Sequence, residues 1–103
     1  FALQVFQYIS VAALVNSKIL CVHGGIGPDF TKLDDLRKLP KPNPYQLYNW
    51  RALPAVHQAL WGDPAETDTQ TGYSNSPRGE GIYVFGADTV EKFCQENGLD
   101  CTF

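Results

Sequence analysis

Short apolar runs separated by polar turns organise the first quarter of the chain. Residues 9–15 are apolar except for Ser10, and a second apolar run covers Ile19–Val22. The polar pair Asn16-Ser17 lies between the two runs and favours a tight turn. This pattern predicts a buried hairpin. A buried helix is the alternative, but Gly24-Gly25 ends the second run too early for one.

Helical signals occur in three places between residues 1 and 61. Residues 1–6 are predicted as the tail of a helix. A second helix is predicted to begin with Thr31 as its cap and Asp34 at its third position, to carry leucines three residues apart, and to stop at Pro40. Prolines then interrupt residues 40–49, which predicts an irregular surface crossing. A short helix is predicted after Pro54, within residues 54–61.

The last third of the chain alternates between loop, strand and helix signals. Residues 65–77 are polar and rich in turn formers, which predicts a loop. Residues 82–85 suit a short strand. Residues 88–97 carry an apolar stripe at helical spacing, and Gly98 is a suitable residue for the position after the helix. Residues 99–103 alternate between apolar and polar and predict another strand, so the fold class is α/β.

Composition narrows the class of protein. The chain has 103 residues, which allows one domain at most, and 44% hydrophobic content favours a packed core. A formal net charge of −3 argues against nucleic-acid binding. No apolar run reaches the roughly 18 residues that suggest a membrane span, and no signal peptide is recognisable. Cys21, Cys94 and Cys101 have no zinc-like spacing and are expected to be buried free thiols, so we expect an intracellular protein of the cytoplasm or nucleus.

The strongest local signal is a histidine at the end of an apolar strand. His23 directly follows Ile19–Val22, and Gly24-Gly25 comes next. Ligands gather at the carboxyl ends of strands in α/β sheets, and neutral imidazole is a common ligand of Zn, Fe and Mn. His23 is therefore a candidate metal ligand. The alternative is a histidine whose hydrogen bonds are satisfied at a strand end.

Two further segments carry charged groups beside glycines. Arg78 is followed by Gly79, and its planar fork of donors matches two phosphate oxygens. Asp63 lies between Gly62 and Pro64, and a carboxylate on such a rigid turn can orient a histidine or an arginine. An exposed arginine in a surface loop and a turn aspartate are the respective alternatives.

The order of these segments resembles the phosphoprotein phosphatase family, which includes the type 1, type 2A and calcineurin catalytic subunits. Residues 12–29 are similar to its His-Gly-Gly segment, and residues 33–37 to its next helix. Residues 60–64 resemble its Trp-Ser-Asp-Pro motif, with Gly62 in place of Ser. Residues 78–88 resemble its Arg-Gly and Thr-Phe-Gly-Ala-Asp run, and the likeness continues through Asp100.

The resemblance implies a fold, a reaction and site residues. The fold would be part of a metallophosphoesterase-like β-sandwich flanked by helices, with residues 1–103 forming a partial catalytic domain. The reaction would be hydrolysis of phosphoserine and phosphothreonine by water activated at two metal ions, Mn, Fe or Zn. His23 would be a metal ligand, Arg78 and Asp63 catalytic residues, and Trp61 a substrate contact together with Arg78. A phosphoprotein substrate and a regulatory subunit would be the partners.

The departures from the family pattern limit what this chain does alone. The Asp-x-His, Gly-Asp-x-x-Asp-Arg-Gly and Asn-His-Glu motifs do not occur in it, and Phe103 comes just before the family's next histidine ligand. Residues 41–58 have no close family likeness, and His57 there is expected to be a surface histidine. We therefore expect the chain alone to be inactive, with His23, Asp63 and Arg78 facing one pocket. The alternative function is a truncated or degenerate phosphatase domain kept as a non-catalytic interaction module.

Overall fold

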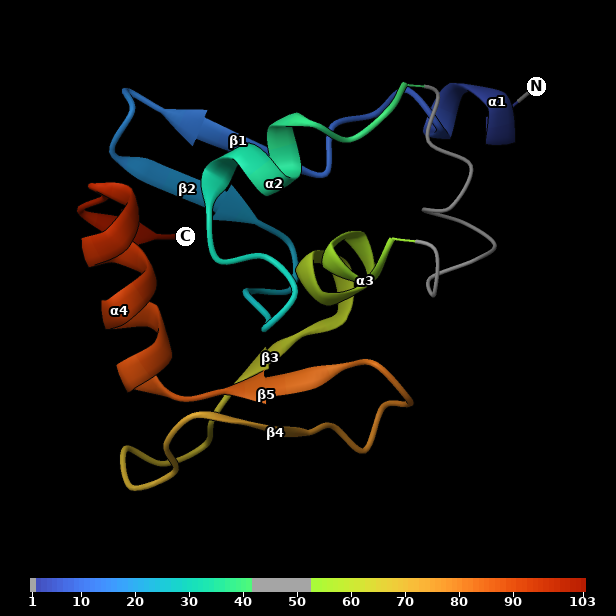
Figure 1. Ribbon diagram of the computed structural model, residues 1–103. Coiled ribbons are helices and arrows are strands. Elements are labelled where there is room, and N and C mark those ends of the chain that lie inside the picture. The colour runs from blue at the N-terminus through green and yellow to red at the C-terminus, as the bar shows by residue number, and fades with distance from the viewer. Residues whose placement is uncertain (1, 42–52) are drawn as a thin grey trace.

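The computed structural model describes residues 2–41 and 53–103, and within them the strands form two three-stranded sheets (Figure 1). In the first sheet, β1 (Ala12–Val15) pairs antiparallel with β2 (Ile19–Val22), and β2 pairs parallel with β6 (Cys101–Thr102). Asn16 and Ser17 both have positive φ in the turn between β1 and β2. The predicted hairpin is therefore confirmed, and the predicted strand in residues 99–103 is shorter than expected.

The second sheet contains two short strands that the sequence pattern missed, Asp63–Pro64 and Tyr73–Asn75. Its order is β3-β5-β4, with β3 at Asp63–Pro64, β4 at Tyr73–Asn75 and β5 at Tyr83–Phe85. β3 pairs parallel with β5, and β4 pairs antiparallel with β5. The prediction of a loop throughout residues 65–77 was wrong at β4. The ladder to β5 holds this polar segment extended, together with an edge-to-face contact of the Tyr73 and Tyr83 rings, whose centroids lie 6.4 Å apart.

The four described helices agree with the predicted segments, with shifted ends. They are α1 (Ala2–Phe6), α2 (Leu33–Arg37), α3 (Pro54–Trp61) and α4 (Ala87–Asn97). α4 ends where predicted, because Gly98 follows it in the left-handed conformation with φ of 65°. Pro40 and Lys41 lie outside regular structure, as predicted, and the rest of the predicted crossing, 42–49, lies outside the described residues.

The start of α2 differs from the prediction by one residue. Lys32 occupies the cap position, and Asp35, not Asp34, is the acidic residue at the third helical position. The Asp35 carboxylate accepts hydrogen bonds from the backbone N–H groups of Thr31 and Lys32, each at 3.2 Å. The prediction that Thr31 caps the helix was therefore wrong. The carboxylate satisfies amides that precede the helix, so the Thr31 hydroxyl is not needed.

The core lies where β2, α3, α4 and β5 meet (Figure 1). Phe30 is fully buried and makes an edge-to-face contact with Phe93 of α4, at 6.0 Å between ring centroids. Cys94 is buried as expected, whereas Cys21 is half-buried and Cys101 is exposed. The buried cluster consists of eight residues: Leu20, Ile26, Phe30, Ala59, Phe85, Phe93, Cys94 and Leu99.

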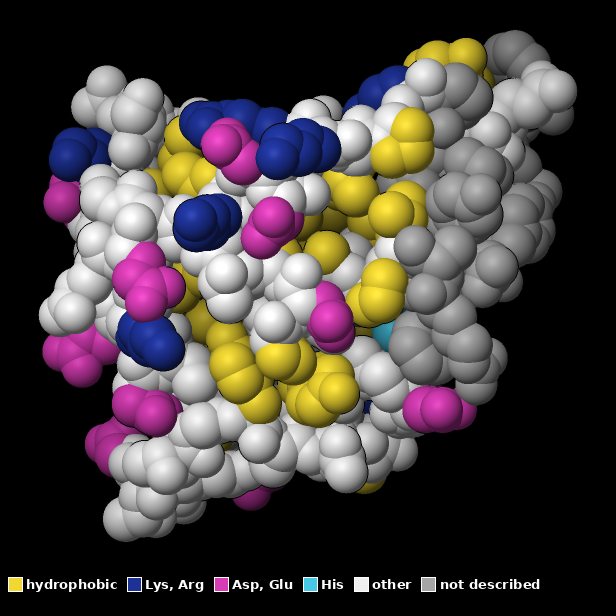
Figure 2. All heavy atoms as spheres, viewed as in Figure 1, with side chains coloured by type: hydrophobic (Ala, Val, Ile, Leu, Met, Phe, Trp, Pro, Cys, Tyr) yellow, Lys and Arg dark blue, Asp and Glu magenta, His cyan; other side chains and the backbone are white. Residues whose placement is uncertain are grey.

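The surface carries charges of both signs. Figure 2 shows Lys and Arg side chains interspersed with Asp and Glu across the viewed face, so no cationic stripe runs over it. Among the described helices, none is long and apolar enough to cross a membrane.

Candidate functional site

His23 stands at the carboxyl end of β2, as predicted, and its loop is held tightly against α3. The His23 side chain is exposed, while Gly25, Ile26 and Gly27 are buried. The N–H groups of Gly24 and Gly25 both donate to the carbonyl of Ala59 in α3, at 2.7 and 3.3 Å. The backbone direction after β2 is therefore fixed by α3.

Gly24 is required by this close approach. A Cβ at position 24 would lie 2.7 Å from the backbone carbonyl carbon of Leu60 and 2.7 Å from the backbone nitrogen of Trp61. These are backbone atoms at the end of α3, so they cannot rotate away from an added side chain. The glycine pair that follows His23 thus allows the strand end to pack directly on the end of α3.

The end of α3 places Trp61 and Asp63. Trp61 is the last residue of the helix and remains 51% exposed. Gly62 ends the helix, and its N–H donates to the carbonyl of Gln58 at 3.0 Å. Asp63 then enters β3, where it pairs with Val84 of β5. The backbone of Asp63 is therefore held by the sheet on one side and by the helix end on the other.

Arg78 lies in the turn between β4 and β5. The N–H of Ser76 donates to the carbonyl of Ile82 at 3.0 Å, which closes the turn. The buried Ser76 hydroxyl accepts a hydrogen bond from the N–H of Arg78 at 3.1 Å. The turn is therefore held by its own hydrogen bonds, with Arg78 projecting from it.

The Arg78 guanidinium reaches across to Asp63. Its Nε lies 2.5 Å from Asp63 Oδ2, and its Nη2 lies 3.4 Å from Asp63 Oδ1. The hydrogen bond to Asp63 and the attraction of that carboxylate raise the pKa of Arg78 above its usual value. Both side chains remain substantially exposed, so water screens the pair and we assign it an orienting role rather than a large contribution to stability.

His23, Asp63 and Arg78 line one hollow of about 230 Å³, as the sequence analysis predicted. Trp61 lines the same hollow, so all four candidate site residues meet there. A slightly larger hollow of about 280 Å³ lies between β1 and α2, but its walls are mainly apolar and it contains none of these four residues. The smaller hollow is the candidate site because it combines an imidazole, a carboxylate and a guanidinium.

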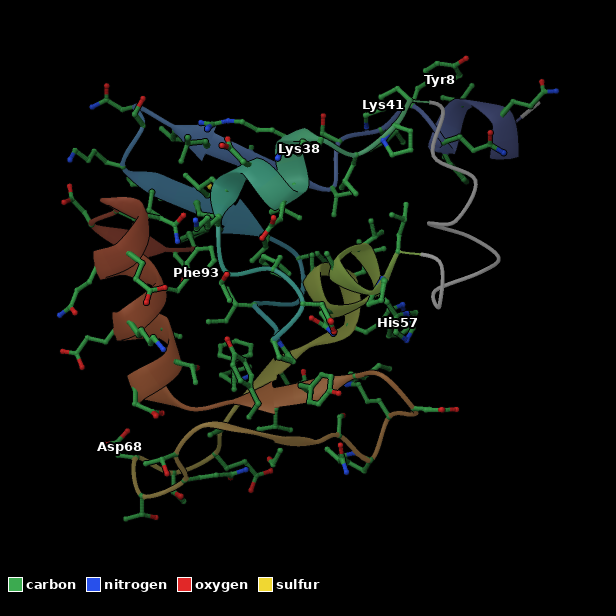
Figure 3. All side chains as sticks on the ribbon, in the orientation of Figure 1. Tyr8, Lys38, Lys41, His57, Asp68 and Phe93 are labelled. Carbon is green, nitrogen blue, oxygen red and sulfur yellow. The ribbon has the colours of Figure 1, made fainter. Side chains whose placement is uncertain are left out.

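His57 is a residue that sequence reasoning placed wrongly. It lies on the side of α3 away from α4 (Figure 3) and is half-buried rather than a surface histidine. Burial lowers its pKa, and a hydrogen bond with the backbone of Glu80 partly offsets that effect. Glu80 belongs to the turn that carries Arg78. The helical spacing of residues 54–61 could have indicated that His57 is partly buried. The turn that covers it could not be recognised, because Glu80 is 23 positions away along the chain.

The described residues form no complete metal site by themselves. Outside residues 1 and 42–52, no group of three or more His, Cys, Asp and Glu side chains is close enough to hold a metal ion. The exposed His23 imidazole faces the hollow and has no hydrogen-bond partner among the described residues. The His23 imidazole therefore suits one ligand position of a metal ion. Asp63 does not suit a second position, because its carboxylate is already paired with Arg78.

Comparison with known proteins decides the family. The family model described as calcineurin-like phosphoesterase matches residues 1–103. The chain belongs to this family. The serine/threonine-protein phosphatase 4 catalytic subunit of Saccharomyces cerevisiae is 35% identical over 100 residues, which are 97% of this chain and 30% of that protein. The corresponding subunit of Candida glabrata is 36% identical over 100 residues, or 29% of its length.

A solved structure of a phosphoesterase confirms the fold. It is a protein serine/threonine phosphatase from Saccharomyces cerevisiae with similarity to human phosphatase PP5. It matches with a TM-score of 0.74 and 28% identity, over 97% of this chain and 29% of that chain. The predicted α/β fold of a metallophosphoesterase is therefore confirmed. This phosphoesterase chain spans about three tenths of the length of the relatives that it matches.

Proposed function

We propose that this chain is part of the catalytic domain of a serine/threonine protein phosphatase that hydrolyses phosphoserine and phosphothreonine. The observation that carries the proposal is the pairing of Arg78 with Asp63 at the hollow that His23 also lines. The relatives named as phosphatase 4 catalytic subunits support the same reaction class. Residues 1–103 would then be one segment of a larger catalytic domain.

Arg78 suits the role of phosphate ligand. Asp63 takes the Nε side of the guanidinium, and within the described parts of the chain the remaining N–H groups have no other partner. A guanidinium with a fixed plane can donate to two oxygens of a phosphoryl group, whose charge grows in the transition state. Asp63 would act by setting that plane, at the cost of partly neutralising the cation.

His23 suits the role of one metal ligand, with the rest of the ligand set coming from outside the described residues. A pair of Mn, Fe or Zn ions, when bound, would supply Lewis-acid chemistry for attack of water on phosphorus. The part of this chain in the reaction is to present the imidazole from the rigid end of β2 and to hold the phosphate oxygens through Arg78.

Trp61 suits a contact with the substrate beside the phosphate. Its indole is half exposed at the edge of the hollow, next to Gly62 and Asp63. An aromatic surface there can pack on side chains that flank a phosphorylated residue. We also propose a regulatory subunit as a partner and an intracellular location, in the cytoplasm or nucleus, which the free cysteines Cys21, Cys94 and Cys101 support.

The first prediction tests the reaction itself. The full-length polypeptide that contains this chain is expected to release phosphate from phosphoserine and phosphothreonine peptides, and chelators are expected to abolish the release. Residues 1–103 expressed alone are expected to show no turnover above background, because no group of three or more metal-binding side chains forms within residues 2–41 and 53–103. Absence of turnover by the metal-loaded full-length protein would instead support a non-catalytic interaction module.

The second prediction concerns His23. His23→Ala in the full-length polypeptide is expected to weaken metal binding by at least about tenfold, since even residues that only orient a ligand have effects of that size. Metal content after dialysis against a metal buffer, measured by mass spectrometry, provides the readout. His57→Ala is the matched control, because His57 lies on α3 outside the lining of the hollow. Equal metal content in the His23→Ala variant and the wild type would remove His23 from the ligand set.

A further inference from the structure

Gln58 of α3 is a buried polar residue that the proposed reaction does not use. Its exposed fraction is 1%, and the other buried polar residue among those described is Ser76. A buried side-chain amide is costly unless both its oxygen and its nitrogen find partners. Both partners of Gln58 belong to Asp29: Oε1 accepts a hydrogen bond from the Asp29 N–H at 3.1 Å, and Nε2 donates to the Asp29 carboxylate.

The contact with Asp29 pins the far end of the His23 loop. Gln58 occupies the space that a Cβ at Gly27 would fill, so the loop lies directly on the amide. The near end is held by the next residue of the helix, since the Ala59 carbonyl accepts hydrogen bonds from Gly24 and Gly25. Two consecutive residues of α3 therefore hold both ends of the segment that follows His23.

The same helix leads into the other half of the site. α3 ends at Trp61, and Asp63, which orients Arg78, comes two residues later. His57, the residue before Gln58, contacts the backbone of Glu80 in the turn that carries Arg78. A short helix thus contacts every segment that brings a candidate residue to the hollow.

We infer that Gln58 is a positioning residue of the site: through Asp29 it holds residues 23–29 against α3 and so fixes His23 relative to Asp63 and Arg78. This inference rests on the proposed function. Gln58 is buried and lies outside the lining of the hollow. It acts through the loop, so its loss changes where the imidazole stands without changing which groups are present.

The chemistry of the pair allows a test by exchange of groups. A glutamine offers one acceptor and one donor, which match the N–H and the carboxylate of Asp29. Q58E keeps the shape but brings a second carboxylate against the Asp29 carboxylate, and like charges at this distance repel. In the double variant D29N/Q58E, the new amide at position 29 can donate to the new carboxylate at position 58. The double variant therefore restores a complementary pair with the donor and acceptor exchanged.

The experiment uses the full-length polypeptide and measures two quantities. Q58E is expected to lower kcat for a phosphopeptide by about 10- to 100-fold, because displacement of a reacting group by about 1 Å has effects of this size. Q58E is also expected to speed hydrogen exchange at Gly24 and Gly25. D29N/Q58E is expected to return both quantities to within about twofold of the wild type. Q95E, on the exposed face of α4, controls for the added charge.

The exchange measurement separates this inference from the proposed function. If the wild type lacks phosphatase activity, the proposed function fails, while hydrogen exchange still reports whether Gln58 holds the loop. If Q58E fails to fold, D29A provides the same test, because Asp29 is exposed and its removal leaves no buried charge. Unchanged kcat or unchanged exchange at residues 24–25 in either variant would overturn the inference. An equal loss of kcat in Q58E and D29N/Q58E would overturn it as well, because exchanging the donor and the acceptor restores kcat only if residues 29 and 58 act as a hydrogen-bonded pair.

Discussion

Replacing Arg78 by alanine in the full-length polypeptide is expected to lower kcat/KM for a phosphopeptide by about 100-fold or more, the size seen when one donor to a developing oxyanion is removed. The guanidinium is already oriented by Asp63 at the hollow, so its ordering cost has been met before substrate binds. Loss of the guanidinium should therefore remove its whole stabilisation of the transition state, which is measured as a lower kcat/KM. Steady-state kinetics with a phosphoserine peptide measures the change, and inhibition by inorganic phosphate should weaken in parallel.

Two further variants make the Arg78 result specific. Arg78→Lys keeps the charge but loses the planar fork, so it is expected to recover only part of the activity. Arg37→Ala is the matched control, because Arg37 forms an exposed pair with Asp34 on α2 and lies outside the candidate site. Unchanged kcat/KM in Arg78→Ala, with wild-type folding, would show that Arg78 is a surface arginine, as the sequence alone allowed.

Local patterns predicted the elements whose cause lies within a few residues. The β1–β2 hairpin was predictable because both apolar runs and their polar turn are contiguous. The end of α4 was predictable because Gly98 sits where a left-handed residue closes a helix. The position of His23 at a strand end followed from the apolar run before it and the glycines after it. In each case the deciding residues are neighbours in sequence.

Features that depend on distant partners were missed. β4 is polar and looks like a loop until β5 pairs with it. His57 looked exposed because its partner Glu80 lies in another turn. Gln58 looked like an ordinary helical residue, although its amide is buried against Asp29. The gathering of His23, Asp63 and Arg78 was anticipated from the order of motifs, but only the folded structure shows that Asp63 pairs with Arg78 rather than with His23.

The second large effect is expected on stability, from Phe30→Ala. Phe30 is fully buried, and truncation of such a phenylalanine typically costs about 3–5 kcal/mol of unfolding free energy. The cavity would open between the His23 loop and α4, where the Phe30 ring meets Phe93 edge to face. Urea unfolding of the full-length polypeptide, followed by tryptophan fluorescence, measures the loss as a lower midpoint at an unchanged slope.

Phe30→Leu and a cycle with Phe93 test whether packing at this contact is the cause. Phe30→Leu retains most of the apolar volume and is expected to lose clearly less stability than Phe30→Ala. Combining Phe30→Ala with Phe93→Ala should cost less than the sum of the single changes, by about 0.5–1.5 kcal/mol, because the two rings interact directly. Since Phe30 follows Asp29, the alanine variant should also loosen the end of the His23 loop that Gln58 holds. A loss below about 1 kcal/mol in Phe30→Ala would mean that this loop does not pack on α4 in solution.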